Sequence, residues 1–183
     1  MVGGKAKGQK LKGAVAPGAR PTTERVRAAI FNILQGELYQ QERVLDLFAG
    51  TGSLGIEALS RGASWADFVE RDRRQCQVIQ SNLETTGFSA SACVYCSDVD
   101  RSLVTLAGPY ELVLLDPPYR MQDLDEVLGK IGAAPRLVAG GGKVVAGHSK
   151  HLTLSPQYGF LSLVSHRRYG DNVVDFYVRE NGP

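Results

Sequence analysis

Short apolar runs alternate with helical patterns through the middle of the chain. The runs are short and are bounded by turn residues, so they predict strands. Strands are expected near residues 43–48, 65–70, 92–96, 111–115 and 142–147, and helices near 53–61, 73–85, 100–106 and 122–131. This order is typical of parallel sheets with right-handed crossovers and helices on both faces. The pattern therefore predicts an α/β fold around one mostly parallel sheet.

The last part of the chain has a different pattern. Two β-rich runs, Phe160–Arg168 and Val173–Arg179, are separated only by the turn-forming residues 169–172. That turn leaves no room for a helix, so the runs predict an antiparallel hairpin. A seven-stranded sheet that ends in such a hairpin resembles the Rossmann-like class I methyltransferases. On this pattern alone, other nucleotide-binding enzymes remain open.

The N-terminal part of the chain begins without any apolar period. Its first residues are rich in Gly, Lys and Ala and predict a loop or a loosely ordered arm. A helix should follow, capped by Thr22 or Thr23 and stopped by Gly36. The apolar stripe expected to face the core consists of Val26, Ala29, Ile30, Ile33 and Leu34.

The charge of the chain is unevenly distributed. The formal net charge is +2, but the first 27 residues carry seven Lys and Arg against Glu24 alone, and the rest holds 14 basic and 18 acidic residues. A basic segment on an acidic body suits a polyanionic partner. The alternative is a solvated, flexible tail. We therefore divide the chain into a basic arm with its helix, residues 1–36, and a main domain, residues 37–183.

Length and composition fit one compact domain. The chain has 183 residues, of which 43% are apolar. It lacks a secretory signal and has no apolar stretch long enough to span a bilayer, so we expect a soluble, cytoplasmic monomer without membrane contact.

Three cysteines, Cys76, Cys93 and Cys96, are too few for a disulfide framework and suit a reducing compartment. The C-x-x-C of Cys93 and Cys96 lacks further ligands at zinc spacing, so no metal is expected.

A glycine-rich turn follows the first expected strand. The segment Gly50–Gly55 has the G-x-G-x-x-G spacing, which lets the backbone approach a ligand at a helix N-terminus but leaves NAD-binding enzymes open. Asp46 favours a ligand other than NAD, because an acid beside the turn opposes a pyrophosphate and suits a cationic, amino-acid-bearing ligand. The D-x-F-x-G-x-G segment resembles the first motif of S-adenosylmethionine methyltransferases. In that reading Asp46 helps to order the methionine end, directly or through water. The residues expected to line the cofactor are Phe48, Ala49, Gly50 and Gly52.

Acidic residues end the next two expected strands. Glu70 is placed to accept hydrogen bonds from both ribose hydroxyls, a feature shared with NAD proteins. Asp98 is placed to accept from the adenine amino group, with the backbone of Val99 at the ring edge. Asp98 also fits a helix N-cap, and the two roles are compatible.

The strongest motif follows the fourth expected strand. Asp116-Pro117-Pro118-Tyr119 comes directly after a buried apolar run, where the strand order of such a sheet reverses and ligands bind. An exocyclic amine on a base is a poor nucleophile, because its lone pair is delocalised into the ring. The Asp116 carboxylate and the Pro117 carbonyl can accept its two hydrogens and make the lone pair available. Pro118 stiffens the loop, and Tyr119 offers a flat face on which a base can stack.

Five segments together resemble the RsmD family of bacterial methyltransferases. They are Lys7–Leu11, Arg20–Arg27, Phe31–Leu34, Asp46–Gly52 and Asp116–Arg120. The resemblance implies S-adenosyl-L-methionine as cofactor, N2-methylguanine in small-subunit (16S) rRNA as product, and an assembling small ribosomal subunit as partner. Asp-Pro-Pro-Tyr is shared with adenine-N6 DNA methyltransferases, so Arg20–Arg27 carries the assignment to rRNA. Met1–Ala6 departs from the family, since it lacks the Arg-Ile-Ile run of an opening strand.

The resemblance also implies which cations meet the RNA. The expected RNA-contact residues are Lys7, Lys10, Arg20, Arg25, Arg27 and Arg120. Arg20, Arg25 and Arg27 contact phosphates or shape a lid over the cofactor; the alternative for Arg20 and Arg27 is a structural pair with the acidic body. Residues 167–171 fit the closing hairpin of the family and receive no catalytic role.

Three other functions compete with this reading. A DNA adenine methyltransferase is disfavoured because the chain is too short for a target-recognition domain. Methylation of a protein glutamine usually uses a loop that opens with Asn, whereas this loop opens with Asp116. A non-catalytic RNA-binding assembly factor is disfavoured because Asp46, Glu70 and the Asp116–Tyr119 motif are all present.

Overall fold

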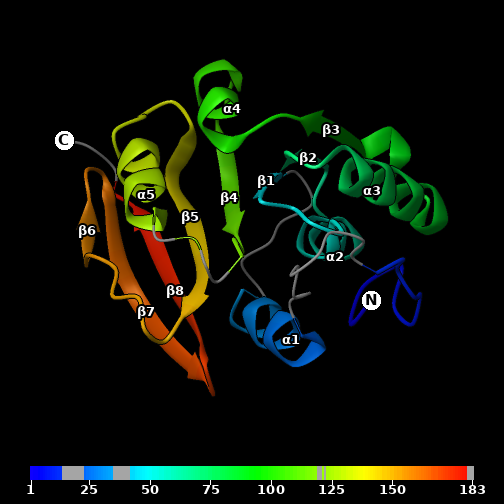
Figure 1. The fold of residues 1–183 in the computed structure, drawn as a ribbon, viewed down its shortest axis with the longest axis horizontal. Coiled ribbons are helices and arrows are strands. Elements are labelled where there is room, and N and C mark those ends of the chain that lie inside the picture. The colour runs from blue at the N-terminus through cyan, green and yellow to red at the C-terminus, as the bar shows by residue number, and fades with distance from the viewer. Residues whose placement is uncertain (14–22, 35–41, 119–120, 122, 181–183) are drawn as a thin grey trace.

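One mixed sheet organises the protein. The structure is a computed structural model that describes residues 1–13, 23–34, 42–118, 121 and 123–180. The strands lie in the order β3-β2-β1-β4-β5-β8-β7-β6 (Figure 1). Their bounds are β1 Arg43–Leu47, β2 Trp65–Glu70, β3 Ala92–Cys96, β4 Tyr110–Leu115, β5 Val138–Ser149, β6 Gln157–Tyr158, β7 Leu161–Tyr169 and β8 Asn172–Arg179. The helices are α1 Glu24–Ile33, α2 Ser53–Ser60, α3 Arg73–Thr86, α4 Val99–Thr105 and α5 Leu124–Gly132, with a short 3-10 turn at Ser89–Ser91.

The strands β1 to β5 are parallel, and the strand order reverses at the centre of the sheet. β1 pairs with β2 on one side and with β4 on the other, and Leu47 lies opposite both Val69 and Leu115. The segments that follow β1 and β4 therefore leave the sheet side by side. A ligand site is expected at such a reversal.

The predicted hairpin is confirmed. β8 pairs antiparallel with both β5 and β7, and the β7–β8 turn lies between Tyr169 and Asn172. The sheet has eight strands and not the seven we expected, because Gln157–Tyr158 adds the short edge strand β6. Two residues are too few to give a recognisable alternation of apolar and polar side chains.

Helices cover both faces of the sheet, as predicted (Figure 1). One apolar core joins α1, α2 and α3 to alternate strand residues such as Val44 and Val145. The other joins α4 and α5 to the intervening residues, such as Leu45 and Ala146. Successive side chains of a strand point to opposite faces, so each central strand contributes to both cores.

The helix α1 forms where expected but turns a different side to the core. The Thr23 hydroxyl accepts a hydrogen bond from Val26 N at 3.3 Å and caps the helix. Val26, Ile30 and Leu34 are buried as predicted, but Ile33 is 37% exposed and Phe31 is fully buried. The assignment of Ile33 to the core was wrong, because the buried stripe runs through Phe31, over whose ring the Arg61 guanidinium lies at 5.2 Å. The predicted stop at Gly36 lies outside the described residues.

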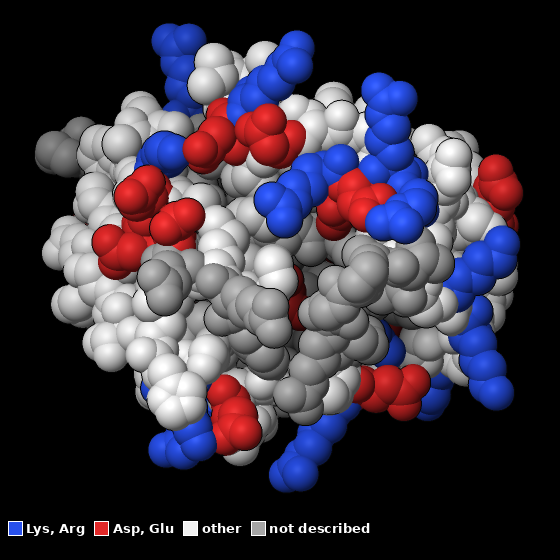
Figure 2. All heavy atoms as spheres, viewed as in Figure 1, with Lys and Arg blue, Asp and Glu red and all other residues white. Residues whose placement is uncertain are grey.

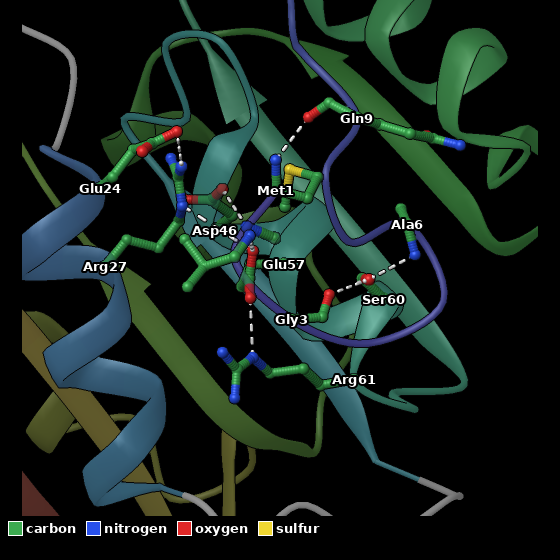
Figure 3. Close-up of polar contacts among 12 residues, drawn as sticks. Met1, Gly3, Ala6, Gln9, Glu24, Arg27, Asp46, Glu57, Ser60 and Arg61 are labelled. Atoms are coloured by element: carbon green, nitrogen blue, oxygen red, sulfur yellow. Dashed lines mark hydrogen bonds and ion pairs between the residues drawn. The ribbon is translucent and has the colours of Figure 1, made fainter.

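The first 13 residues form a loop, as predicted, and this loop is docked on the domain. Lys5 N donates to Ser60 O at 2.7 Å, and Ala6 N donates to Ser60 Oγ at 2.9 Å. Further along, Lys12 N donates to Asn82 Oδ1 at 2.7 Å. The side chains of Met1 and Ala6 are buried in the core beside α2 (Figure 3). Hydrogen bonds from the backbone of this segment to α2 and α3 hold it in place. A composition rich in Gly and Lys does not predict such bonds.

Two cysteines are closer than their sequence positions suggest. Cys76 in the first turn of α3 and Cys96 at the end of β3 form a disulfide, with Cα atoms 6.1 Å apart, and Cys93 is free. This single disulfide was not predicted from the sequence; the two cysteines meet because β2 leads into α3 beside the end of β3. None of the described helices is long and apolar enough to cross a membrane.

Candidate active site

The turn after β1 is tight and is held from two sides. Phe48, Gly50 and Gly52 have φ values of 58°, 56° and 75°, the left-handed region that favours glycine. Ala49 N donates to Val69 O at 3.0 Å, and Gly52 N donates to Ala49 O at 2.7 Å. Phe48 is the only described non-glycine residue with a positive φ, and such strain is typical of ligand-binding segments.

Asp46 is buried beneath this turn and binds the start of α2. Its Oδ2 accepts a hydrogen bond from Gly55 N at 2.8 Å. A Cβ atom at position 55 would lie 2.4 Å from the Phe68 ring, so only glycine permits this approach. Burial raises the pKa of Asp46 well above its ordinary value; the Gly55 hydrogen bond lowers it, and the charges of Asp116 and Glu70 raise it further. The carboxyl therefore orders the turn from inside.

Glu70 fixes the other side of the turn. Its Oε2 accepts from Gly50 N at 3.0 Å, and its Oε1 accepts from Asp72 N at 2.9 Å. A carboxylate has about four lone-pair positions, so each oxygen keeps capacity for a second donor. Glu70 also lines the cleft described below, where such a donor would approach.

Asp98 caps the helix α4. Its Oδ1 accepts from Arg101 N at 2.8 Å, and its carbonyl accepts from Ser102 Oγ at 2.9 Å. Asp98 and Val99 both line the cleft, together with the neighbouring Ser97. The N-cap role is therefore present, and the position of the residue also suits a ligand contact.

Asp116 stands at the end of β4, against the neighbouring strand β5. A Cβ atom added to Gly147 would lie 2.8 Å from Asp116 Oδ1, so the carboxylate packs on the glycine backbone. Pro117 and Pro118 line the cleft, and Pro118 O accepts a hydrogen bond from Met121 N at 2.8 Å. The predicted site residues Tyr119 and Arg120 lie outside the described residues.

These loops open on one large cleft of about 1250 Å³ at the carboxyl edge of the sheet. Acidic atoms are visible at the bottom of a hollow near the centre of this face (Figure 2). Of the predicted cofactor and catalytic residues, the cleft is lined by Phe48, Gly50, Glu70, Asp98, Val99, Asp116, Pro117 and Pro118. Asp46 lies below the lining, and the carboxylates of Asp46, Glu70 and Asp116 are close enough to interact electrostatically. The acidic residues that line the cleft, among them Glu70, Asp98 and Asp116, favour a cationic ligand.

Sequence reasoning missed the far wall of this cleft. Val26 and Ile30 of α1, Gly147 and His148 of β5, and Val174 of β8 all line it. His148 is buried, with Nε2 3.0 Å from Asp175 Oδ2, and His166 Nδ1 lies 2.6 Å from the other oxygen of that carboxylate. These residues come from one helix and several strands that are distant in sequence, so no local motif predicts their proximity.

The predicted RNA-contact residues lie in different environments. Lys7, Lys10 and Arg25 are exposed, whereas Arg27 is buried and its Nε lies 3.8 Å from Glu57 Oε2 (Figure 3). Glu57 is itself buried and accepts from Val2 N at 2.9 Å and from Arg61 Nε at 2.8 Å. Arg27 thus makes the structural pair with the acidic body that the sequence left as its alternative. Arg20 lies outside the described residues.

Comparison with known proteins identifies the family of the chain. The family model described as "Conserved hypothetical protein 95" matches residues 1–178. An Escherichia coli protein named "Ribosomal RNA small subunit methyltransferase D" is 40% identical over 128 residues, which cover 70% of this chain and 64% of that protein. The chain belongs to the RsmD family. Another relative, YlbH of Bacillus subtilis, is 37% identical over 182 residues, 98% of each chain.

Solved structures show the same RsmD-family fold. The Escherichia coli protein YhhF superposes with a TM-score of 0.86 at 31% identity, covering 98% of this chain and 96% of that one. An RNA methyltransferase from Salinibacter ruber, solved with S-adenosyl-L-homocysteine, superposes with a TM-score of 0.65 at 16% identity, over 90% of this chain and 96% of that one. At that identity the likeness concerns the fold alone. The fold is that of the class I methyltransferases.

A metal centre has no support in the described residues. No group of three or more His, Cys, Asp or Glu side chains in the described part of the chain is arranged to hold a metal ion. The C-x-x-C pair does not offer two free thiols, because Cys96 is bonded to Cys76 and only Cys93 is free.

Proposed function

We propose that the protein transfers the methyl group of S-adenosylmethionine to the exocyclic N2 amine of a guanine in small-subunit (16S) rRNA. The observation that carries this proposal is the position of Asp116 and Pro117 at the strand-order reversal, beside the glycine-rich turn. The family relatives support rRNA as the substrate, since one of them is named for methylation of the small-subunit RNA. We propose further that the protein acts in the cytoplasm, as a monomer, on a subunit that is being assembled.

The residues of the cleft fit S-adenosylmethionine. Glu70, Asp98 and Asp116 line the cleft and make it acidic, which suits a ligand that carries a sulfonium and an amino group. Glu70 would bind the ribose hydroxyls through its remaining lone pairs, and Asp98 with Val99 would bind the adenine. Asp46 would act indirectly, because its carboxyl is buried and holds Gly55 at the start of α2. The cofactor would supply an electrophilic methyl group.

Asp116 and Pro117 would prepare the nitrogen for attack. The Asp116 carboxylate and the Pro117 carbonyl would accept the two N–H hydrogens of the guanine amine, which favours a lone pair directed at the methyl group. Positioning of the two reactants would supply most of the rate enhancement. The alkylated nitrogen carries one proton too many, and it would leave to Asp116 or to water. Tyr119 would stack on the base.

The test is to incubate the protein with labelled S-adenosylmethionine and three separate substrates: undermethylated small subunits, free 16S rRNA and DNA. Digestion to nucleosides should place the label in N2-methylguanine from the ribosomal substrates. Label in N6-methyladenine would instead support the adenine-N6 alternative. Cofactor binding without transfer to any substrate would support a non-catalytic assembly factor.

A further inference from the structure

A row of residues crosses four strands from the proposed catalytic carboxylate to the surface. Gly147 of β5, whose backbone packs on the Asp116 carboxylate, pairs with Val174 of β8. Val174 pairs in turn with Arg167 of β7. Side chains at directly paired positions of antiparallel strands lie on the same face of the sheet. Arg167 therefore lies on the face that carries Asp116.

The neighbours of Arg167 confirm this assignment of faces. His166 contacts Asp175 at 2.6 Å, and Asp175 also contacts His148, so these three side chains share one face. Successive side chains alternate between faces, which places Arg167 on the other one. Val174 belongs to the core on the α1 side of the sheet, in agreement with this result.

The lining of the cleft reaches β8, and Arg167 lies one strand beyond it. Gly147 and Val174 line the cleft, and Arg167 is exposed on the next strand. Three strand spacings of about 4.8 Å separate the backbone at position 116 from that at position 167, about 14 Å in all. The flexible side chain of Arg167 can extend over part of this distance. If the base lies at Asp116, the sugar and phosphate of the same nucleotide would lie between Asp116 and the guanidinium of Arg167.

Arg167 differs from the other cations of this hairpin in its partners. Within the described part of the chain its guanidinium makes no hydrogen bond or ion pair. By contrast, Arg168 Nε donates to Gly170 O at 3.0 Å, and Arg179 Nη1 donates to Val138 O at 2.8 Å. An exposed guanidinium without a protein partner, one strand beyond the lining of the cleft, is suited to bidentate binding of a phosphate.

We propose that Arg167 binds the RNA backbone phosphate next to the nucleotide whose base enters the cleft. This inference rests on the proposed function, because it names the contact that positions the same RNA substrate. The site would add a second anchor, on the β7–β8 hairpin, to the basic N-terminal segment. Phosphate contacts fix register without reading sequence, so Arg167 would orient the RNA and leave base choice to the cleft.

The experiment compares Arg167→Gln with Arg168→Gln. Both remove one positive charge from adjacent residues, but Arg168 lies on the opposite face of the strand. Each variant is assayed for binding to undermethylated small subunits at several salt concentrations and for methyl transfer at saturating S-adenosylmethionine. Arg167→Gln should weaken RNA binding about tenfold at low salt and reduce the slope of log K against log salt by about 0.7 to 0.9, the loss of one phosphate contact. Arg168→Gln should change affinity less than twofold.

Further outcomes separate this inference from the proposed function. Arg167→Lys should keep the salt slope and recover part of the affinity, and S-adenosylmethionine affinity should be unchanged in all three variants. Equal losses of slope in Arg167→Gln and Arg168→Gln would overturn the inference, since a diffuse charge effect does not depend on the face. An unchanged slope in Arg167→Gln would overturn it as well. If the wild type binds the subunits but yields no N2-methylguanine, the proposed function fails whatever the binding data show.

Discussion

At the scale of single residues, three carboxylates with different surroundings share one site. Asp46 is buried and bound to Gly55 N, Glu70 holds the backbone of the turn, and Asp116 borders the cleft. Their charges interact, since Asp116 and Glu70 both raise the pKa of Asp46. The site thus combines one structural acid, one backbone anchor and one acid exposed to the substrate. Each position has its own expected phenotype.

Substitution of Asp116 should separate chemistry from cofactor binding. Asp116→Ala removes a proposed acceptor for the guanine amine and should lower turnover by about 10² to 10³-fold. S-adenosylmethionine affinity, measured by calorimetry, should stay within a few-fold of the wild type. Asp46→Ala should instead weaken the binding of S-adenosylmethionine, because it leaves Gly55 N without its acceptor and disorders the turn. Equal losses of cofactor affinity in both variants would contradict this division of roles.

Asp46 should also make stability depend on pH. Because the folded state raises its pKa, the group contributes stability below the unfolded value of about 4, and this contribution is lost as pH rises toward the folded pKa. Asp46→Asn keeps an oxygen for Gly55 N but cannot ionise. It should therefore have a higher urea midpoint of unfolding than the wild type at pH 7 to 8, and the difference should shrink toward pH 4. A variant that is less stable than the wild type across this range would refute the argument.

At the scale of elements, the meeting of β4, β5 and β8 builds the far wall of the site. Gly147 lets the Asp116 carboxylate lie against the backbone of β5, and the hairpin brings Val174 beside it. Gly147 does not have a positive φ. Glycine is therefore needed at this position because a side chain would not fit, and not because of the backbone conformation.

Gly147→Ala should therefore impair the reaction with little effect on the fold. The added methyl group would lie 2.8 Å from Asp116 Oδ1 and should displace the carboxylate, lowering kcat about tenfold or more while S-adenosylmethionine still binds. The matched control is Gly129→Ala in α5, where an added Cβ meets nothing within 4 Å. It should keep full activity and gain about 0.5–1 kcal/mol of stability from its helical position. Equal activities of the two variants would disprove the packing argument.

The elements themselves were largely predictable, and their contacts were not. The alternation of apolar runs located β1 to β5 and the helices between them to within a few residues, because period and turn residues are local signals. The positions of Glu70 and Asp116 at strand ends followed from the same pattern. In α1 the burial of Val26, Ile30 and Leu34 was predicted, but the choice between Phe31 and Ile33 could not be made, since both are apolar. The approach of Gly147 to Asp116 depends on strand pairing across 31 positions, which no local pattern encodes.

At the scale of the whole molecule, the N-terminal segment is tied to the cofactor turn through one buried side chain. Asn82 of α3 is fully buried; its Oδ1 accepts from Lys12 N at 2.7 Å, and its Nδ2 donates to Thr51 O at 2.9 Å. The same Nδ2 contacts Lys12 O at 3.2 Å. A basic segment that was expected to be loose is thereby coupled to the turn between β1 and α2. Occupancy of the cleft and order of the segment should influence each other.

Asn82→Ala should break this coupling. It leaves Lys12 N and Thr51 O without partners and should cost about 1–3 kcal/mol of stability. Amide hydrogen exchange of residues 5–13 should rise, and S-adenosylmethionine affinity should fall several-fold because the turn loses a support. The control is Ser81→Ala, which removes only the exposed contact of Ser81 Oγ with Lys12 Nζ and should leave both readouts near the wild type. In the wild type, S-adenosylmethionine should slow exchange in residues 5–13, and in Asn82→Ala this protection should disappear. Protection that persists in the variant would show that the segment and the turn are coupled by another route.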